Sequence, residues 1–363
     1  MASLMKSIID KNQPKTSSYV DQLLELALRA HGEDSPEYRG IYHQYYTIPD
    51  RGGDLSNARH FQAEVAPEQA KTGLERMYRR VVVVDLVSAC AAECSYCVRG
   101  YYDRFSLSNA KLDEVADAVA RDHHLREILI TGGDPLIAPR KLAYLIERIL
   151  ERAPNIRYVR IGTRLPIQDP ERFDPTLLAL FERASKSLRV EIASQINHPF
   201  ELQEPTTTLY RSLRGVGVNL YSQNVLLKRV NDTVETMTEL YDQLRYLEIA
   251  PHYLFHAVPL KGTEKYRTSV QKGLHIISHL SSSGLLSGRA KPQYALITDI
   301  GKVNLYHGSI VADKGSTLRI RTSYRLADRL AWNPSYILPA TGSVNHDGTL
   351  DVLYPNGVDD TEE

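Results

Sequence analysis

Residues 90–97 read CAAECSYC and contain all three cysteines of the chain, Cys90, Cys94 and Cys97, in the spacing Cys-x3-Cys-x2-Cys. They follow the apolar run VVVVDLV (residues 81–87), which is typical of a buried strand. Three thiolates on one short loop can bind three irons of a [4Fe–4S] cube and leave the fourth iron open to a small molecule. The sequence therefore predicts a cluster-binding loop at the end of a buried strand.

Two other interpretations of these cysteines stay open, a structural zinc site and three ordinary buried thiols. A closed zinc site takes four ligands, and the sequence offers no fourth cysteine. The spacing after a strand favours the cluster. The open fourth iron is similar to that of the radical S-adenosylmethionine (SAM) enzymes, in which the methionyl amine and carboxylate of SAM bind the open iron.

Length and composition place the chain among soluble α/β proteins. Its 363 residues suffice for one large barrel-type domain or two smaller domains, with a sizeable core. Lys and Arg total 44, as do Asp and Glu, so we expect neither a nucleic-acid surface nor a basic membrane face. No apolar run approaches the roughly 20 residues of a membrane span, and residues 1–14 lack the apolar core of a signal peptide. Three clustered cysteines fit a reducing compartment, and we expect a cytoplasmic protein.

From residue 80 onward, strand-like and helix-like stretches alternate with a period of about thirty residues. This pattern is typical of βαβ units with a parallel sheet, and six such units predict an α/β fold with a partial, open (β/α)6 barrel. The predicted strands are residues 81–86, 127–131, 158–162, 189–193, 218–221 and 252–257. The predicted helices are residues 111–121, 140–151, 175–186, 207–213, 234–244 and 270–280.

The two ends of the chain differ from this repeat. Residues 1–78 predict an N-terminal helical segment, with helices at 18–30 and about 67–78 and a loop-rich stretch at 42–54. Residues 291–363 predict a small β-rich C-terminal extension around a candidate cofactor lysine. Its predicted strands are residues 293–298, 316–321, 335–338 and 350–353. We therefore divide the chain at 1–78, 79–290 and 291–363.

Polar and glycine-rich stretches follow the predicted strands. Because chemistry in such barrels takes place at the carboxyl ends of the strands, these stretches predict one ligand-binding rim. The rim would combine the cysteine loop with residues 131–135, 163–166, 194–199 and 222–224.

Six further motifs give the chain a specific resemblance. Gly132-Gly133-Asp134 alone is weak evidence for a SAM site, because a plain tight turn also uses glycines. It nevertheless resembles the motif that holds the methionyl amine of SAM in radical SAM enzymes. In order, the chain reads TGGDPL (131–136), VRIGTRLP (159–166), NHP (197–199), QNVLLKRVND (223–232), PHYL (251–254) and YRTSVQKG (266–273). Over about residues 80–303 it resembles the lysine 2,3-aminomutase family, radical SAM enzymes that use pyridoxal 5′-phosphate (PLP).

The resemblance implies a [4Fe–4S] cluster, SAM and PLP on one barrel. Cys90, Cys94 and Cys97 would bind the cluster. Arg99 would bind the substrate carboxylate, for which its planar guanidinium is suited, although a surface salt bridge is the alternative. Lys302 would be the catalytic lysine that carries PLP, although most lysines at turns are simply solvated. The remaining cofactor-binding residues would be Gly132, Gly133, Asp134, Thr163, Arg164, Gln195 and Gln223 for SAM, and Arg80 or Arg79 for the PLP phosphate.

The chain also departs from the family pattern. Val258 stands where lysine mutases carry an aspartate for the distal ammonium of the substrate, so free lysine is a poor candidate substrate. Gln195 and Tyr96 stand where the family often has histidines. Only Gly301 precedes Lys302 in place of a glycine run, and the extension lacks the zinc-binding cysteines of some relatives.

The leading hypothesis is a radical SAM, PLP-dependent 2,3-aminomutase, an isomerase that moves the α-amino group of an amino acid to its β-carbon. One alternative is a PLP-free radical SAM lyase, dehydrogenase or epimerase, and another is a non-catalytic iron–sulfur protein. The expected partners are a small amino-acid substrate, a flavodoxin- or ferredoxin-type electron donor and a second copy in a homodimer, with no nucleic acid and no membrane.

Overall fold

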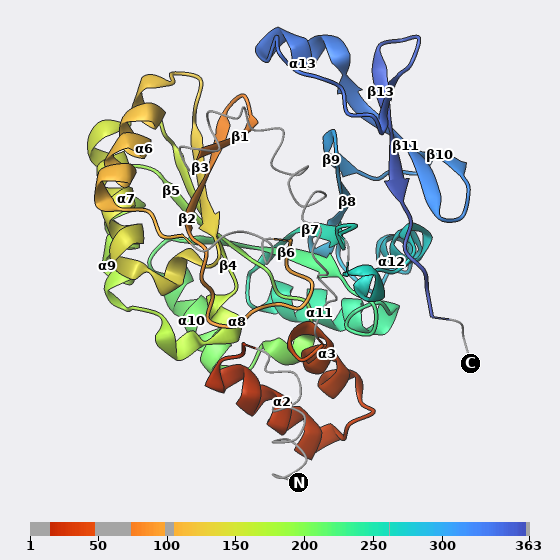
Figure 1. Cartoon of the computed structure of the whole chain (residues 1–363). Coiled ribbons are helices and arrows are strands. Elements are labelled where there is room, and N and C mark those ends of the chain that lie inside the picture. The colour runs from red at the N-terminus through yellow and green to blue at the C-terminus, as the bar shows by residue number, and fades with distance from the viewer. Residues whose placement is uncertain (1–14, 48–73, 99–104, 261, 361–363) are drawn as a thin grey trace.

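The computed structural model describes residues 15–47, 74–98, 105–260 and 262–360, which form a nine-stranded sheet, a four-stranded sheet and surrounding helices (Figure 1). The strands of the large sheet are β1 (Leu74–Tyr78), β2 (Val81–Val87), β3 (Glu127–Gly132), β4 (Tyr158–Thr163), β5 (Arg189–Ser194), β6 (Asn219–Leu226), β7 (Ala250–His256), β8 (Gln293–Thr298) and β9 (Gly301–Asn304). The helices are α2 (Ser18–His31), α3 (Pro36–Tyr45), α6 (Asn109–Arg121), α7 (Pro139–Arg152), α8 (Leu165–Gln168), α9 (Thr176–Ala184), α10 (Glu204–Gly215), α11 (Val234–Tyr246), α12 (Val270–Ser282) and α13 (Leu326–Trp332).

The large sheet is an open, curled half-barrel in which neighbouring strands follow each other in sequence order. Strands β2 to β8 are parallel, whereas β1 and β9 pair antiparallel with β2 and β8 at the two edges. Figure 1 shows the sheet curving from β1, through β4 to β6, to β9, with α6, α7, α9, α10 and α11 on its outer side. The predicted α/β class and partial barrel are confirmed.

Alternating burial along the strands places the core between the sheet and these helices. Val84, Ile130 and Ile161 are fully buried on the outer face of the sheet, where Leu145 and Ile149 of α7 belong to the same apolar cluster. Each such side chain contributes about 1.5–3 kcal/mol by leaving water. The inner face carries more polar residues, which is where a ligand would lie.

The six predicted strands and six predicted helices of residues 79–290 are present, with ends that differ by a few residues. The largest difference is β6, which continues through residues 222–224, predicted as a rim loop. The Ser222 hydroxyl donates to Asn224 Oδ1 (3.1 Å), and the Tyr241 hydroxyl donates to the same oxygen (3.0 Å). These internal partners allow polar side chains to occupy a buried strand.

The sheet extends beyond the six predicted strands. Residues 293–298, predicted within the C-terminal extension, form β8 and pair parallel with β7. The chain then turns back as β9, which carries Lys302 opposite Ile297. The boundary at residue 290 stays a prediction, but the sheet itself continues to Asn304.

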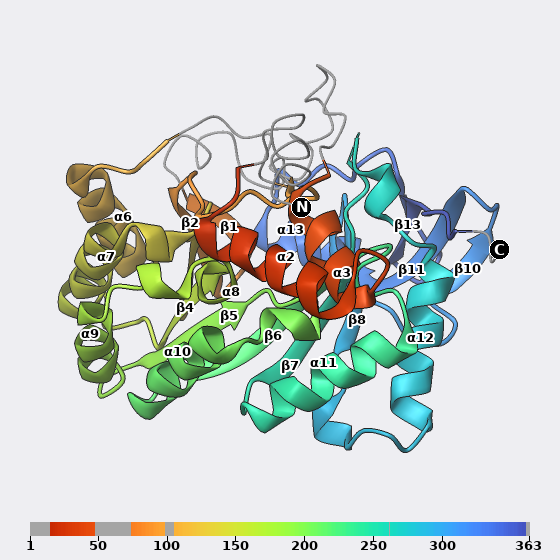
Figure 2. The same ribbon diagram turned by 90° about the horizontal axis from the view of Figure 1, so that it is seen from below.

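The N-terminal helices lie across one end of the curled sheet (Figures 1 and 2). Helix α2 confirms the predicted helix at 18–30, but α3 includes residues predicted as loop, since Ser35 caps it and Pro36 favours a helix start. The predicted helix at 67–78 is wrong over β1, which is a strand paired with β2; its remaining residues and most of the predicted loop lie outside the described residues. In the part of the chain that the structure describes, no helix has the length and apolarity needed to cross a membrane.

The C-terminal extension is an antiparallel sheet in the order β10-β11-β13-β12, with strands β10 (Ile310–Asp313), β11 (Thr317–Arg325), β12 (Gly342–Val344) and β13 (Thr349–Pro355). The predicted strand at 335–338 is wrong, because the flanking Pro334 and Pro339 cannot donate ladder hydrogen bonds, and β12 forms instead. The extension docks on the barrel through the Tyr354 hydroxyl, 2.9 Å from His256 Nδ1, and through Arg267, which donates to the Pro355 carbonyl (2.6 Å).

We expect Gly273→Ala to destabilise the barrel. A Cβ at this position of α12 would lie 2.1 Å from the Tyr294 hydroxyl oxygen, so α12 and β8 would have to separate. The predicted loss is about 1–3 kcal/mol in the free energy of unfolding, measured by urea denaturation. Gly215→Ala in α10 is the control, since its Cβ would meet no atom within 4 Å and alanine favours a helix. Equal stabilities of the two variants would contradict this packing argument.

Candidate functional site

The three cysteines lie in a loop directly after β2, and their thiols are half-buried. Burial raises the pKa of Cys90, and negative charge on Asp134 and on the other two cysteines adds to the rise. Among the described residues, no three Cys, His, Asp or Glu side chains gather as the ligands of a single ion would. Three thiols on one loop could bind three irons of a four-iron cube.

The N-terminal helices hold this loop in place. The amide of Glu93 donates to the Lys15 carbonyl (2.7 Å), and the amide of Ser95 donates to the Gln44 carbonyl (2.8 Å). Ala92 packs within the apolar cluster of α2 and α3. The loop is therefore enclosed between the barrel and the N-terminal segment.

Gly132 and Gly133 allow the end of β3 to approach the cysteine loop. A Cβ on Gly132 would lie 2.2 Å from the Val87 carbonyl oxygen, and a Cβ on Gly133 would lie 2.2 Å from that of Ala89. The Asp134 amide donates to the same Ala89 carbonyl (2.8 Å). These glycines have a structural role whether or not SAM is bound, because no side chain fits between the two loops.

The carboxylate of Asp134 is occupied by protein donors. It accepts hydrogen bonds from the Thr163 hydroxyl (2.8 Å), from the amides of Arg164 (2.7 Å) and Leu165 (2.8 Å), and from the amide of Leu136 (3.0 Å). Burial nevertheless raises the pKa of Asp134. These two side chains join the end of β3 to the end of β4, and the expectation that Asp134 and Thr163 bind SAM stays a prediction.

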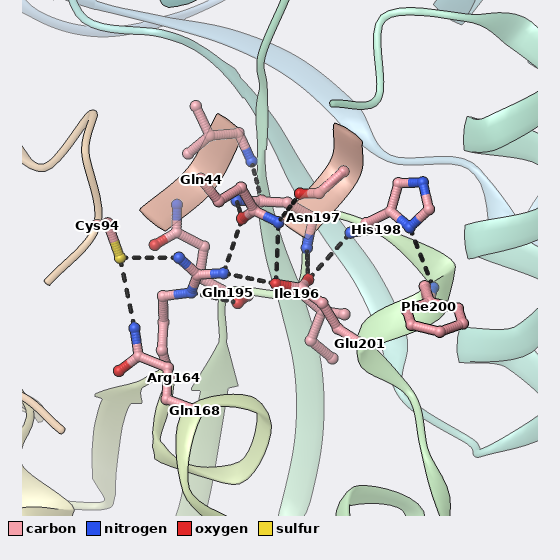
Figure 3. Close-up of polar contacts among 12 residues, drawn as sticks. Gln44, Cys94, Arg164, Gln168, Gln195, Ile196, Asn197, His198, Phe200 and Glu201 are labelled. Atoms are coloured by element: carbon pink, nitrogen blue, oxygen red, sulfur yellow. Dashed lines mark hydrogen bonds and ion pairs between the residues drawn. The ribbon is translucent and has the colours of Figure 1, made fainter. Parts of the chain in front are cut away.

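Arg164 lies beneath the cysteine loop, with its side chain only 7% exposed (Figure 3). Its guanidinium donates to Cys94 Sγ (2.8 Å), to the Tyr96 hydroxyl (2.6 Å) and to Gln44 Oε1 (2.9 Å). Burial opposes its charge, but the surrounding acidic groups hold the pKa of Arg164 well above its usual value. In the structure Arg164 contacts a predicted cluster ligand, and its predicted role in binding SAM stays a prediction.

Glu201 neutralises Arg164 from a fully buried position, 2.8 Å away. Its carboxylate also accepts from Gln44 Nε2 (3.1 Å) and from the amides of Asn197 (2.6 Å) and His198 (3.0 Å). Figure 3 shows these groups converging from α3, from the cysteine loop and from the segments after β4 and β5. The pair therefore connects four segments that are far apart in the sequence.

Sequence reasoning missed most of this network. Asn197 belongs to a motif that we noted, but nothing marked Gln44, Gln168 or Glu201 as its partners. Gln168 Nε2 donates to Cys94 Sγ (3.5 Å), and Asn197 Nδ2 donates to the Tyr96 hydroxyl (2.6 Å). Gln44 in α3 and Glu201 after β5 belong to no motif in the sequence, and only their burial reveals the network.

The other predicted site residues are placed as follows. Gln195 follows β5, and its carbonyl accepts from Arg164 Nε (3.1 Å). Gln223 is a partly buried residue of β6, paired with Tyr253. Arg80 is exposed in the turn between β1 and β2, at the opposite end of β2 from the cysteines. Arg99 lies outside the described residues, so its role stays a prediction.

Lys302 points into the interior of the curled sheet. Its ammonium lies 3.8 Å from the ring centroid of Tyr253, 5.8 Å from that of Tyr78 and 5.9 Å from that of Phe255. Among the described residues, no carboxylate lies within ion-pair distance of it. Burial and the nearby Arg160, opposed by Glu127, together lower the pKa of Lys302 to about 8.

Arg160 is the second interior cation, and it is paired. It contacts Glu127 and lies 3.5 Å from Glu191, with its guanidinium over the ring of Tyr221. Glu127, which acts on the pKa of Lys302, begins β3, whereas Gly132 ends it beside the cysteine loop. Glu127 and Gly132 are themselves separated along β3 by roughly 17 Å, at about 3.3 Å per residue.

We expect Glu201→Gln to destabilise the fold strongly. The substitution keeps the shape but leaves the Arg164 charge buried without an anion, a loss of about 3 kcal/mol in the free energy of unfolding, measured by urea denaturation. Glu147→Gln is the matched control, because Glu147 pairs with Arg183 on the surface, where both side chains are more than 40% exposed. That variant should lose at most about 1 kcal/mol. Similar losses in both variants would show that burial does not strengthen the Arg164 pair.

A family profile described as a 4Fe-4S single cluster domain matches residues 79–164, which include the cysteine loop, the Gly-Gly-Asp turn and Arg164. Among solved structures, a radical SAM methyltransferase from Sphaerobacter thermophilus is 19% identical, with a TM-score of 0.45 over 61% of this chain and 68% of that one. A TM-score of 0.45 is too low for this likeness to bear on fold or function.

Curated relatives give a closer match. The L-lysine 2,3-aminomutase of Clostridium subterminale is 32% identical over 229 residues, 62% of this chain and 53% of the relative. The glutamate 2,3-aminomutase of Clostridioides difficile is 30% identical over 225 residues, which are 61% of this chain and 52% of the relative. An Aquifex aeolicus protein whose name also refers to L-lysine 2,3-aminomutase is 35% identical over 251 residues, 67% and 66%. The chain thus spans about half to two thirds of the length of these relatives. It is a divergent homologue of the lysine 2,3-aminomutases, and its residues 79–164 match a 4Fe-4S single cluster domain.

Proposed function

We propose that the protein is a radical SAM, PLP-dependent amino acid 2,3-aminomutase that moves an α-amino group to the β-carbon. The observation that carries this proposal is the environment of Lys302. A PLP-binding lysine must present a neutral amine, and neutrality is favoured by burial and by a nearby cation. Lys302 has both, since it lies against Tyr253 inside the sheet and its pKa is lowered by burial and by Arg160.

The residues present fit a cluster with bound SAM at the carboxyl ends of the strands. Cys90, Cys94 and Cys97 would bind three irons, and Arg164 places positive charge beside one of these ligands. Because Gly132 and Gly133 leave no side chain between the two loops, backbone groups of β3 are close to the cysteines. We propose that these backbone groups, with Gln195 and Gln223, bind SAM.

The residues around Lys302 fit PLP. The turn that carries Arg79 and Arg80 directly follows Tyr78, whose ring lies 5.8 Å from the Lys302 ammonium. We propose that Arg80 binds the PLP phosphate, since Arg160 is already paired with two carboxylates. When bound, the cluster and SAM supply radical chemistry that removes a hydrogen atom, and PLP stabilises the unpaired electron during migration.

The residues of the chain would hold the substrate between these two regions. Arg99, two residues after Cys97, would bind the substrate carboxylate near the cluster. Lys302 would hold PLP, and the rings of Tyr253 and Phe255 would exclude water around the lysine amine. One electron would come from a flavodoxin- or ferredoxin-type donor.

We propose an amino acid other than free lysine as substrate. Val258 replaces the expected anion, and an unpaired buried ammonium costs several kcal/mol. Glutamate 2,3-aminomutase activity, named for one relative, indicates that homologous barrels act on other amino acids. Anaerobic incubation with SAM, PLP, dithionite and a panel of α-amino acids, followed by mass analysis for β-isomers, tests the substrate. Efficient turnover of lysine would contradict this part of the proposal.

Each of Cys90→Ala, Cys94→Ala and Cys97→Ala should abolish iron binding and reductive cleavage of SAM, because each removes one cluster ligand. The measurements are iron content after anaerobic reconstitution and methionine released from SAM. Ser95→Ala in the same loop is the control, since its loop contact to Gln44 is made by the backbone amide. A cysteine variant that keeps full SAM cleavage would contradict the ligand assignment.

Covalent capture of PLP should depend on pH with a midpoint near 8. The pKa of Lys302 is lowered to about 8, so its amine becomes neutral as the pH rises through that value, well below the 10.5 of an exposed lysine. Capture is measured by borohydride trapping and peptide mass analysis across pH 6–11.

Lys302→Ala should lose capture and amino migration but keep iron and uncoupled SAM cleavage. Lys314→Ala, at an exposed turn of the extension, should retain both PLP capture and amino migration. SAM cleavage without any PLP capture in the unmodified protein would favour the PLP-free lyase, dehydrogenase or epimerase. Capture at another lysine would contradict the assignment to Lys302.

A further inference from the structure

The hairpin that carries Lys302 has little support from the large sheet. Strand β9 has four residues, lies at the edge of the sheet and pairs only with β8. Gly301, which begins β9, has a φ of +113°, in the region that favours glycine. A short edge strand with hydrogen bonds on one side opens easily, so the position of Lys302 requires further contacts.

Three separate parts of the C-terminal extension supply such contacts to residues 299–302. The Tyr324 hydroxyl of β11 donates to the Lys302 carbonyl (2.7 Å). Arg329 of α13 donates to the Ile300 carbonyl. The Thr341 hydroxyl, just before β12, donates to Asp299 Oδ2 (2.7 Å).

The same groups pack over the one glycine of the hairpin. The guanidinium of Arg329 lies 4.2 Å from the ring centroid of Tyr324, and Arg329 is largely buried. A Cβ on Gly301 would lie 3.0 Å from Arg329 Nη2 and 3.3 Å from the Tyr324 hydroxyl oxygen. The extension therefore packs against the backbone of the hairpin, and a side chain at residue 301 would require Arg329 and Tyr324 to shift.

We propose that Tyr324, Arg329 and Thr341 are positioning residues, through which the extension fixes the β8–β9 hairpin and holds the Lys302 amine inside the curled sheet. They would take the place of the glycine run that is missing before Lys302. Loosening the hairpin moves the amine away from Tyr253 and towards water. The inference rests on the proposed function only for the role of Lys302 in binding PLP.

The test is the pH profile of reductive methylation at Lys302, quantified by peptide mass analysis on the full chain reconstituted with its cluster. This readout needs no PLP. The titratable and charged groups that face the amine are Tyr78 of β1, Glu127 of β3, Arg160 of β4, and His252 and Tyr253 of β7. All of them stay unchanged. The binding of PLP is measured in parallel by absorbance titration.

Tyr324→Phe and Thr341→Val should each raise the pH midpoint for methylation of Lys302 and weaken PLP binding about fivefold, the effect of one lost hydrogen bond. The double variant should raise the midpoint and weaken PLP binding more than either single variant does. Ile320→Val is the control, because Ile320 is buried in the same extension on β11 and its truncation lowers stability to a similar degree. Ile320→Val should leave the midpoint and PLP binding unchanged.

The outcomes separate this inference from the proposed function. Midpoints in Tyr324→Phe and Thr341→Val that equal the Ile320→Val midpoint would overturn the positioning role, whatever the protein does with PLP. A raised midpoint together with no PLP capture in the unmodified protein would support the positioning role and contradict the proposed function.

Discussion

The buried ion pair between Arg164 and Glu201 is the interaction on which the candidate site depends. The guanidinium donates hydrogen bonds to Cys94 of the cysteine loop and to Gln44 of α3. The carboxylate accepts hydrogen bonds from the backbone amides of Asn197 and His198, in the segment after β5. An unpaired charge at this depth is costly, so each segment of the network needs the others in place. The N-terminal helices are thus part of the site, since they supply one wall of the cysteine loop.

Arg160 and Lys302, two cations inside the curled sheet, have different surroundings. Arg160 is held between Glu127 and Glu191, whereas Lys302 faces aromatic rings and has no carboxylate within ion-pair distance among the described residues. Arginine keeps its charge in proteins, whereas a buried lysine loses its proton readily. The paired arginine suits a structural role and the unpaired lysine suits chemistry, which is why the position of Lys302 matters for the proposed function.

The places where the chain departs from its relatives are used to attach the C-terminal extension. His256, in the segment where the expected aspartate is missing, contacts Tyr354 of β13, and burial lowers the pKa of His256 to about 3. The shortened segment before Lys302 is covered by Tyr324 and Arg329. Two segments that depart from the family pattern in the sequence therefore contact the C-terminal extension in the structure.

The sequence by itself determined the cysteine loop and the βα alternation of residues 79–290, because ligand spacing and apolar periodicity are local properties. It also placed Lys302 just after the barrel. Only the tertiary structure decided that β1 and β9 edge the sheet, that Asp134 is saturated by protein donors, and that Glu201 pairs with Arg164. These features depend on burial and on contacts between residues far apart in the chain, and neither can be seen in a local pattern.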